Sequence, residues 1–199
     1  MLHETGSAQE EKARHEGEQA PLPTTHADLL RRFDRLGIAY DLHRHAPFFT
    51  VAEGIEIEKN IPGTHCRNLF LCDKKKTMYL VTAANETQIC LKKLAKVIGA
   101  GRLSFGSADR LWRYLGVRPG SVCPFAVVNN RAGDVNIILD AFMMAQEQVN
   151  FHPMENHMTV GLTPGDLLSF IKDCGHRPHI VDLTPARPEE KENEHAGGS

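Results

Sequence analysis

The feature that most constrains this fold is the shortness of its apolar segments. Glycine and proline recur throughout residues 26–183 and divide the apolar residues into short runs, some with helical spacing and some with strand spacing. No run approaches the ~20 apolar residues that a membrane-spanning helix needs. Short helices interleaved with strand hairpins, without regular strand–helix–strand units, predict an α+β domain with a mixed, largely antiparallel sheet surrounded by short helices.

Capping residues mark where the helices begin and end. Thr25 precedes an amphipathic segment that Gly37 ends, which is typical of one complete helix. Thr50 with Glu53 three residues later forms a capping box at the start of another. The expected helices cover residues 26–36, 50–57, 89–98, 108–115 and 163–174.

Strand-like runs occur between these helices. Two apolar runs flank the charged turn at residues 73–76, which predicts a hairpin that displays lysines at its tip. A second hairpin is expected around residues 130–134, with Phe125–Asn129 and Val135–Leu139 as its strands. The expected strands cover residues 38–42, 68–72, 78–83, 125–129, 135–139 and 179–183.

The two ends of the chain differ in composition from its middle. Residues 1–25 carry five glutamates against one lysine and one arginine, and residues 184–199 carry four glutamates against one of each. Both ends are rich in residues that cannot build a core, so we expect disordered tails at 1–25, which is acidic, and at 184–199. One domain is expected over 26–183.

Positive charge is concentrated in residues 59–118. The formal net charge of the chain is −2, but this segment holds twelve lysines and arginines against three acids. Charge gathered in one segment can attract a polyanion even when the whole molecule is near neutral. A merely solvated surface is the alternative. The candidates for nucleic-acid contact are Lys74, Lys75, Lys76, Lys92, Lys93 and Lys96.

The cysteines and histidines form no metal motif. The five cysteines are scattered without CxxC spacing, and the simplest account is reduced thiols in the cytoplasm. Among eleven histidines, no close pair has an acidic or cysteine partner at a telling spacing. Dinucleotide-binding, phosphate-loop, zinc-protease and serine-hydrolase signatures are also absent from the sequence. We expect no metal and no cofactor. The sequence starts without an apolar leader, which predicts no secretory signal.

Two segments have the character of a small-molecule site. In Gly120-Ser121-Val122-Cys123-Pro124, glycine permits unusual backbone angles, so the loop can direct amide N–H groups at a carbonyl oxygen or a water; an ordinary turn is the alternative. His152 precedes a proline, which holds it extended, as in a pocket wall or a structural site. Cys123 and His152 could also form a thiol–histidine nucleophile, although a buried inert thiol is commoner.

These segments together resemble the YbaK/prolyl-tRNA-synthetase-associated editing-domain family, over about residues 26–183. Within it, the chain is most similar to the free-standing alanyl-tRNA(Pro) deacylases of the ProXp-ala or PrdX type. The resemblance is carried by ordered matches at 28–38, 45–54, 62–65, 68–71, 91–94, 102–106, 120–124 and 151–154.

The resemblance implies an enzyme that removes a wrong amino acid from tRNA by hydrolysing its ester, without a metal or a covalent nucleophile. It implies catalytic roles for Arg67, Asn68, Gly120, Pro124 and His152. It places Val51 and Ile61 in the walls of the amino-acid pocket, and the 120–124 loop, with Ser121, Val122 and Cys123, against the substrate. The implied partners are the acceptor end of tRNA(Pro) and prolyl-tRNA synthetase.

Arg67 departs from the family pattern, which has lysine at this position. A guanidinium does not release its proton in proteins, so Arg67 cannot act as a general base. It can still supply a fixed positive charge to the tRNA terminus, and this is the role we expect. Two further functions stay open: a cysteinyl- or seryl-tRNA deacylase with the same fold, and a tRNA- or synthetase-binding module that has lost hydrolysis. The oligomeric state does not follow from the sequence.

Overall fold

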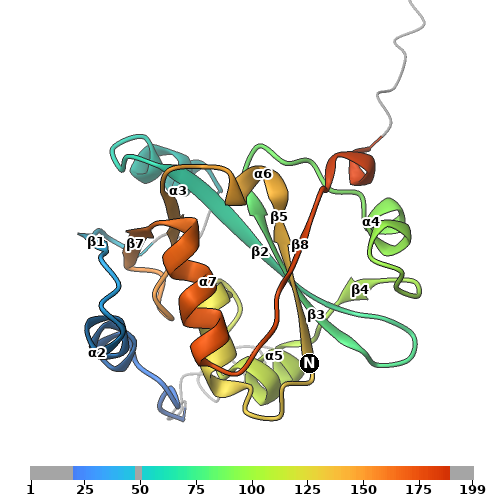
Figure 1. Ribbon diagram of the computed structural model, residues 1–199, viewed down its shortest axis with the longest axis horizontal. Helices are drawn as coiled ribbons and strands as arrows, with labels where there is room; N and C mark the ends of the chain where they lie inside the picture. Colours follow the sequence, from blue (N-terminus) through green and yellow to red (C-terminus); the bar gives the residue numbers. More distant parts are fainter. Residues whose placement is uncertain (1–19, 48–50, 189–199) are drawn as a thin grey trace, which may run out of the picture.

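The computed structural model describes residues 20–47 and 51–188, and its centre is a mixed sheet (Figure 1). Seven strands follow the order β1-β7-β6-β2-β3-β5-β8, and β4 pairs with β2 beside this path. The strands are β1 (Asp41–Arg44), β2 (Thr64–Cys72), β3 (Met78–Ala84), β4 (Ser104–Phe105), β5 (Val135–Asp140), β6 (Val149–Phe151), β7 (Met158–Leu162) and β8 (His179–Val181).

Both kinds of strand pairing occur, which confirms the expected mixed sheet. The β1–β7, β6–β7, β2–β3 and β2–β4 pairs are antiparallel, whereas β2–β6, β3–β5 and β5–β8 are parallel. The hairpin expected around residues 73–76 is β2–β3, and its tip is held by Asp73, whose carboxylate accepts the amides of Lys75 and Thr77 at 2.8 and 2.9 Å.

The helices surround this sheet. They are α2 (His26–Leu36), α3 (Val51–Glu58), α4 (Leu91–Val97), α5 (Ala108–Leu115), α6 (Ala141–Met144) and α7 (Pro164–Asp173). The caps at Thr25, Ser107 and Thr163 are confirmed, since each side chain accepts an amide of its first turn. The expected cap at Thr50 lies outside the described residues.

The predicted strand Phe125–Asn129 is wrong, and with it the second hairpin. Pro124–Asn129 forms a 3-10 helix, η1, in which Pro124 occupies the first turn. Proline has no amide to give to a sheet, and at a helix start none is needed. The buried apolar side chains of η1 pack against α5 and α7 instead. β5 pairs in parallel with β3 and β8.

Two apolar cores lie on the two faces of the sheet, as the alternation along β2 requires. Phe70 and Cys72 belong to the larger core, with α2, α5, α7 and η1, while Leu71 belongs to the smaller core under α4. In the larger core, four aromatic rings meet edge-on with centroids 5.2–5.6 Å apart: Phe33, Phe125, Phe151 and Phe170.

The ordered domain reaches slightly beyond residues 26–183 at both ends. Ala186 is buried in η2 (Thr184–Ala186), and its carbonyl accepts the Cys90 amide at 2.8 Å. Arg118 donates to the Ala20 carbonyl at 2.6 Å. The division into one domain and two tails stays a prediction for the outer residues. In the described ranges, no helix is both long and apolar enough to cross a bilayer.

Candidate active site

A cavity of about 540 Å³ opens where α3, the start of β2 and the 117–123 loop meet the end of β6. Such a volume suits a small ligand or the terminal residue of a larger one. Ten residues line it: Gly54, Ile55, Glu58, Cys66, Arg67, Asn68, Asn85, Gly120, Val122 and His152.

Asn68 is held in one orientation by its neighbour across the hairpin. It faces Thr82 in the β2–β3 register, and the Thr82 hydroxyl donates to Asn68 Oδ1 at 2.9 Å. With its oxygen occupied in this way, the side-chain amide offers its N–H groups to the cavity. Asn68 therefore acts as a fixed hydrogen-bond donor.

His152 follows β6 and is held as a neutral imidazole. Its Nδ1 lies 2.9 Å from the Met158 carbonyl, so Nδ1 carries the proton and Nε2 is the acceptor nitrogen. Burial lowers the pKa of His152 below its ordinary value of 6.5, and nearby His45 and His65 add to this effect. The ring thus presents a hydrogen-bond acceptor at neutral pH.

Two residues of the Gly120–Pro124 loop, Gly120 and Val122, line the wall of the cavity. Gly120 has φ +88°, a conformation that favours glycine, and its α-carbon faces open space. The Ser121 amide donates to the Arg118 carbonyl at 3.0 Å. Within the described part of the chain, no hydrogen bond engages the amides of Gly120 or Val122. These two N–H groups are the candidate donors to an oxyanion.

Cys123 and Pro124 lie behind this wall. Both are buried, and Cys123 Sγ lies 3.8 Å from Met154 Sδ. Burial raises the pKa of Cys123 to about 11, so it is a neutral thiol at neutral pH. This argues against a thiol–histidine nucleophile and limits Cys123 to packing beneath the loop. Pro124 fixes the direction in which η1 leaves the loop.

Arg67 borders the cavity from the other face of β2. The pleat places Asn68 and Cys66 on one face and Arg67 on the opposite one. Its guanidinium Nη2 donates to the Thr87 carbonyl, and its buried Nε has no hydrogen-bond partner among the described residues. Arg67 is therefore a fixed cation at the edge of the cavity.

Glu58 and Cys66 are lining residues that sequence reasoning missed. Glu58 is the one carboxylate among the lining residues; its Oε2 accepts from Asn85 Nδ2 at 3.1 Å and its Oε1 lies 3.8 Å from His65 Nδ1. Burial raises the pKa of the Cys66 thiol, which donates to the Thr64 carbonyl at 3.4 Å. Neither stands in a sequence motif. Helical spacing from Gly54 could have indicated Glu58, and strand alternation from Asn68 could have indicated Cys66.

The structure brings together five of the site residues expected from the sequence: Arg67, Asn68, Gly120, Val122 and His152. Ser121, Cys123 and Pro124 belong to the loop but do not line the cavity. Ile61 is buried outside the lining, where its carbonyl contacts His65 Nε2 at 3.0 Å. The side chain of Val51 lies outside the described residues.

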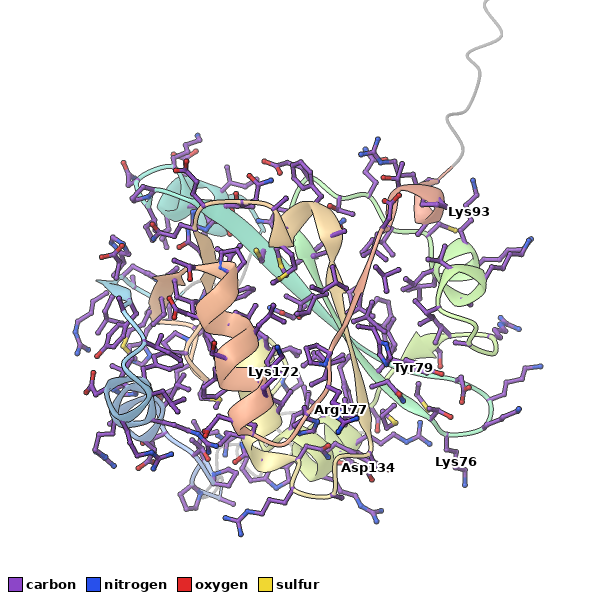
Figure 2. All side chains as sticks on the ribbon, viewed as in Figure 1. Lys76, Tyr79, Lys93, Asp134, Lys172 and Arg177 are labelled. Atoms are coloured by element: carbon purple, nitrogen blue, oxygen red, sulfur yellow. The ribbon has the colours of Figure 1, made fainter. Side chains whose placement is uncertain are left out.

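The lysines expected to contact nucleic acid lie away from the cavity. Figure 2 shows Lys76 at the outer end of the β2–β3 hairpin and Lys93 of α4 beside η2. None of the six lysines is among the lining residues. Cavity residues Cys66, Arg67 and Asn68 occupy the opposite end of β2 from that hairpin tip.

Metal-type ligands converge away from the cavity. Among residues 20–47 and 51–188, one group of three could hold an ion: His26 in α2 with Glu155 and His157 of the β6–β7 connection. His26 Nδ1 already contacts the Glu155 carboxylate directly. None of the three lines the cavity, so we assign them no part in its chemistry.

The sequence matches known proteins over most of the described domain. Residues 45–170 match the family model described as an aminoacyl-tRNA editing domain. The chain is 39% identical over 162 residues to prolyl-tRNA synthetase associated domain-containing protein 1 of Bos taurus, covering 79% of this chain and 94% of that protein. It is 35% identical over 156 residues to the prolyl-tRNA editing protein ProX of Acetoanaerobium sticklandii, covering 78% and 95%.

Solved structures show the same fold at lower identity. A structure described as a candidate trans-editing enzyme for prolyl-tRNA synthetase matches with a TM-score of 0.60 at 16% identity, covering 83% of this chain and 99% of that one. The hypothetical protein APE2540 matches with a TM-score of 0.60, also at 16% identity, over 77% and 97%. Both matches concern the fold alone.

Proposed function

The chain belongs to the aminoacyl-tRNA editing domain family, and we propose that it hydrolyses the ester of alanine wrongly attached to tRNA(Pro). The observation that carries this proposal is the convergence of Asn68, neutral His152 and the open amides of Gly120 and Val122 on one cavity. The acceptor end of tRNA(Pro) is the proposed substrate. Prolyl-tRNA synthetase, named in the descriptions of the relatives, is the proposed source of the mischarged tRNA.

An aminoacyl ester is already activated, so the protein needs mainly to place a water and stabilise negative charge. Water attacks the ester carbonyl carbon, and the carbonyl oxygen becomes an oxyanion that the Gly120 and Val122 amides stabilise. Collapse of this intermediate breaks the bond to the terminal ribose oxygen. That oxygen takes up the proton that the water released, giving free alanine and a ribose hydroxyl.

Asn68 and His152 orient the substrate for this attack. Asn68 donates from its amide nitrogen, and His152 accepts through Nε2, so together they can hold a group that both accepts and donates, such as a ribose hydroxyl. Neither step requires a protein nucleophile. The neutral thiols of Cys66 and Cys123 agree with direct attack by water.

Glu58 allows the cavity to bind an aminoacyl ester in preference to an ordinary ester. The substrate carries a free α-ammonium next to the reacting carbonyl, and a carboxylate is its natural partner. Asn85 holds this carboxylate in place at the cavity. We assign Glu58 to binding of the α-ammonium group.

Selection of alanine over proline is proposed to be by size. A synthetase pocket rejects a substrate smaller by one methylene by only ~1–3 kcal/mol, so a second, smaller pocket adds useful discrimination. Ile55 and Val122 are the described apolar side chains that line the cavity. The Val51 and Ile61 positions remain part of the proposed sieve; buried Ile61 would act from behind the lining.

A deacylation assay tests the proposal. Alanyl-, cysteinyl-, seryl- and prolyl-tRNA(Pro) are each incubated with the full chain, and release of the amino acid is compared with the buffer rate. Fast release of alanine with prolyl-tRNA(Pro) spared is the expected result. Preference for cysteine or serine would reassign the substrate within the fold. Release at the buffer rate from all four would leave a binding module and overturn the proposed hydrolysis.

A further inference from the structure

A second cavity, larger than the proposed active site, is a groove between α2 and α5. It has a volume of about 830 Å³, and its lining includes the end of η1 and residues of α7. Five of its lining residues are arginines: Arg31, Arg32, Arg35, Arg113 and Arg131. We refer to this surface as the arginine groove.

The floor of the groove is fixed by close packing. Gly116, which ends α5 with φ +62°, allows Pro23 and Asn129 to approach so closely that a β-carbon would meet Pro23 Cγ at 2.4 Å. Asn129 donates to the Leu115 carbonyl at 2.8 Å and accepts from the Thr24 hydroxyl at 2.7 Å. The close contact at Gly116 and the hydrogen bonds of Asn129 therefore hold the floor of the groove in one shape.

Positive charge in the groove exceeds negative charge. Asp28 and Asp173 are the two acids of the lining, against five arginines. Arg31 pairs with Asp28, and Arg32 makes two hydrogen bonds to Asp173 Oδ2 at 2.6 and 2.8 Å, which fastens α2 to α7. The two acids are thus already partnered within the protein.

Three arginines are left to act on a ligand. Arg35, Arg113 and Arg131 are exposed, and none of them forms an ion pair among the described residues. They come from three elements: the last turn of α2, α5, and the loop after η1. Guanidinium groups from separate elements facing one groove are suited to several phosphates of one chain.

Trp112 adds an aromatic surface to the same groove. Its ring lies under the Arg118 guanidinium, with 5.0 Å from Cζ to the ring centroid, and Arg118 is itself held by the Ala20 carbonyl at 2.6 Å. Aromatic side chains and arginine planes are both surfaces on which RNA bases stack, and here Arg118 covers one face of the half-buried ring.

We propose that the arginine groove binds the phosphate backbone of the substrate tRNA outside its aminoacyl end. This inference rests on the proposed function, since it supplies the second contact that a tRNA needs when its 3′ end enters the cavity. η1 links the two sites: Val122 lines the cavity and Val128, six residues later, lines the groove. η1 begins at Pro124, so two extended steps of about 3.4 Å from Val122 and four helical steps of about 2 Å to Val128 put these two lining residues at most on the order of 15 Å apart.

The groove differs from the lysine surface expected from the sequence. Lys92, Lys93 and Lys96 stand on α4, which packs on the other core of the sheet. They carry as much charge as Arg35, Arg113 and Arg131, but α4 lies at the right of Figure 1 while α2 and α5 lie in its lower part. The three arginines of the groove and the three lysines of α4 can therefore be compared as a matched pair of variants.

The test measures the affinity of the full chain for uncharged tRNA(Pro) at several salt concentrations, with fluorescence anisotropy as the readout. The groove variant carries Arg35→Gln, Arg113→Gln and Arg131→Gln, and the control carries Lys92→Gln, Lys93→Gln and Lys96→Gln. Because each lost phosphate contact lowers the slope of log K against log salt by about 0.7–0.9, the groove variant, which lacks three arginines, should lose about two to three units of slope and at least tenfold in affinity near 100 mM salt. The α4 variant should stay within about threefold of wild type.

A third variant separates charge from shape. Replacing the same three arginines by lysine keeps the charge and should restore most of the affinity. A groove variant that binds like wild type, or an α4 variant that loses as much as the groove variant, would overturn the proposal. All side chains replaced in the groove are exposed, and a thermal melt confirms that each variant is folded.

Hydrolysis distinguishes this inference from the proposed function. If the groove binds tRNA and the cavity hydrolyses it, the groove variant raises KM for alanyl-tRNA(Pro) and leaves kcat within about twofold. If wild type hydrolyses alanyl-tRNA(Pro) and the groove variant has an unchanged KM, the proposed binding of tRNA by the arginine groove is contradicted. The proposed function would still stand. No hydrolysis by wild type, with binding still dependent on the three arginines, would contradict the proposed function alone.

Discussion

At the residue scale, the account depends on the protonation state of His152. A base whose pKa is lowered in the fold stays neutral below its ordinary value of 6.5. The deacylation rate above the buffer rate should therefore hold its plateau as pH falls through 6.5, and decline only at lower pH. A pH–rate profile of kcat/KM measures this. A decline centred above pH 6.5 would show that the imidazole is not held neutral by burial.

The lowered pKa of His152 also affects the stability of the folded protein. Below pH 6.5 the unfolded chain protonates His152 before the folded chain does, so protonation favours unfolding. The free energy of unfolding should decrease as pH falls through this range, and His152→Asn should reduce that dependence. Urea melts at pH 7.5, 6.5 and 5.5 would measure both. An equal pH dependence in the variant would assign the effect to another group.

Glu58 provides a second test on the substrate itself. Glu58→Gln removes the charge and keeps the shape, so the KM for alanyl-tRNA(Pro) should rise about tenfold if the carboxylate binds the α-ammonium. Glu56→Gln is the matched control, because Glu56 is on the same helix, pairs with Lys59 and does not line the cavity. An N-acetylated alanyl-tRNA should be hydrolysed equally by wild type and Glu58→Gln; unequal rates would contradict this role.

Substitutions of Arg67 test what the arginine does at a position where the family pattern has lysine. The guanidinium is fixed by the Thr87 carbonyl at the edge of the cavity, and we propose that it supplies charge rather than a base. Arg67→Ala should lower kcat about 100-fold, whereas Arg67→Lys should retain part of the activity. Single-turnover rates at saturating enzyme give the comparison. An alanine variant as active as wild type would remove Arg67 from the mechanism.

At the element scale, the Gly120–Pro124 loop depends on one backbone angle. No atom lies near a β-carbon built on Gly120, so the cost of Gly120→Ala comes from its φ of +88° and amounts to about 1–2 kcal/mol of stability. The shifted amides should lower kcat more than they raise KM. Gly133→Ala, at φ +67° and also in open space, is the control: it should cost similar stability and leave the rate unchanged.

Elements with local signals were predictable, and those set by distant pairing were not. Caps at Thr25, Ser107 and Thr163 specify α2, α5 and α7 within a few residues of sequence. β6 and β7 have no such signal: β6 is three residues long, and its partners β2 and β7 are chosen by tertiary packing. Within Phe125–Asn129 the first four residues are all apolar, so the run lacks the period that separates strand from helix.

The residues of the candidate site divide in the same way: those with a signal in the sequence were predictable, and those placed by tertiary packing were not. Gly120 and His152 were found because they stand in segments with a local signal, Asn68 was implied by the family resemblance, and the cavity brings the three together. Glu58 and Cys66 were missed because their place at the cavity depends on how α3 meets β2. The pleat of β2 also places Arg67 on the opposite face from Asn68.

At the scale of the whole molecule, the described domain should act without the outer ends of the chain. Residues 20–188 include the contacts of Ala20 and Ala186 that close the two ends. A chain trimmed to 20–188 should keep kcat/KM for alanyl-tRNA(Pro) within about twofold. Trimming to 26–183 removes both contacts and should lower the melting temperature. Loss of activity in the longer form, with folding intact, would give the outer residues a direct role.

The most direct test of the central claim is the single-turnover rate of alanyl-tRNA(Pro) hydrolysis by wild type and by Asn68→Ala. The account predicts that wild type releases alanine far faster than buffer and that Asn68→Ala loses about 100-fold, while Asn136→Ala on the exposed side of β5 keeps the wild-type rate. A wild-type rate equal to that of buffer, or an Asn68→Ala rate equal to that of wild type, would contradict the assignment of this cavity to ester hydrolysis.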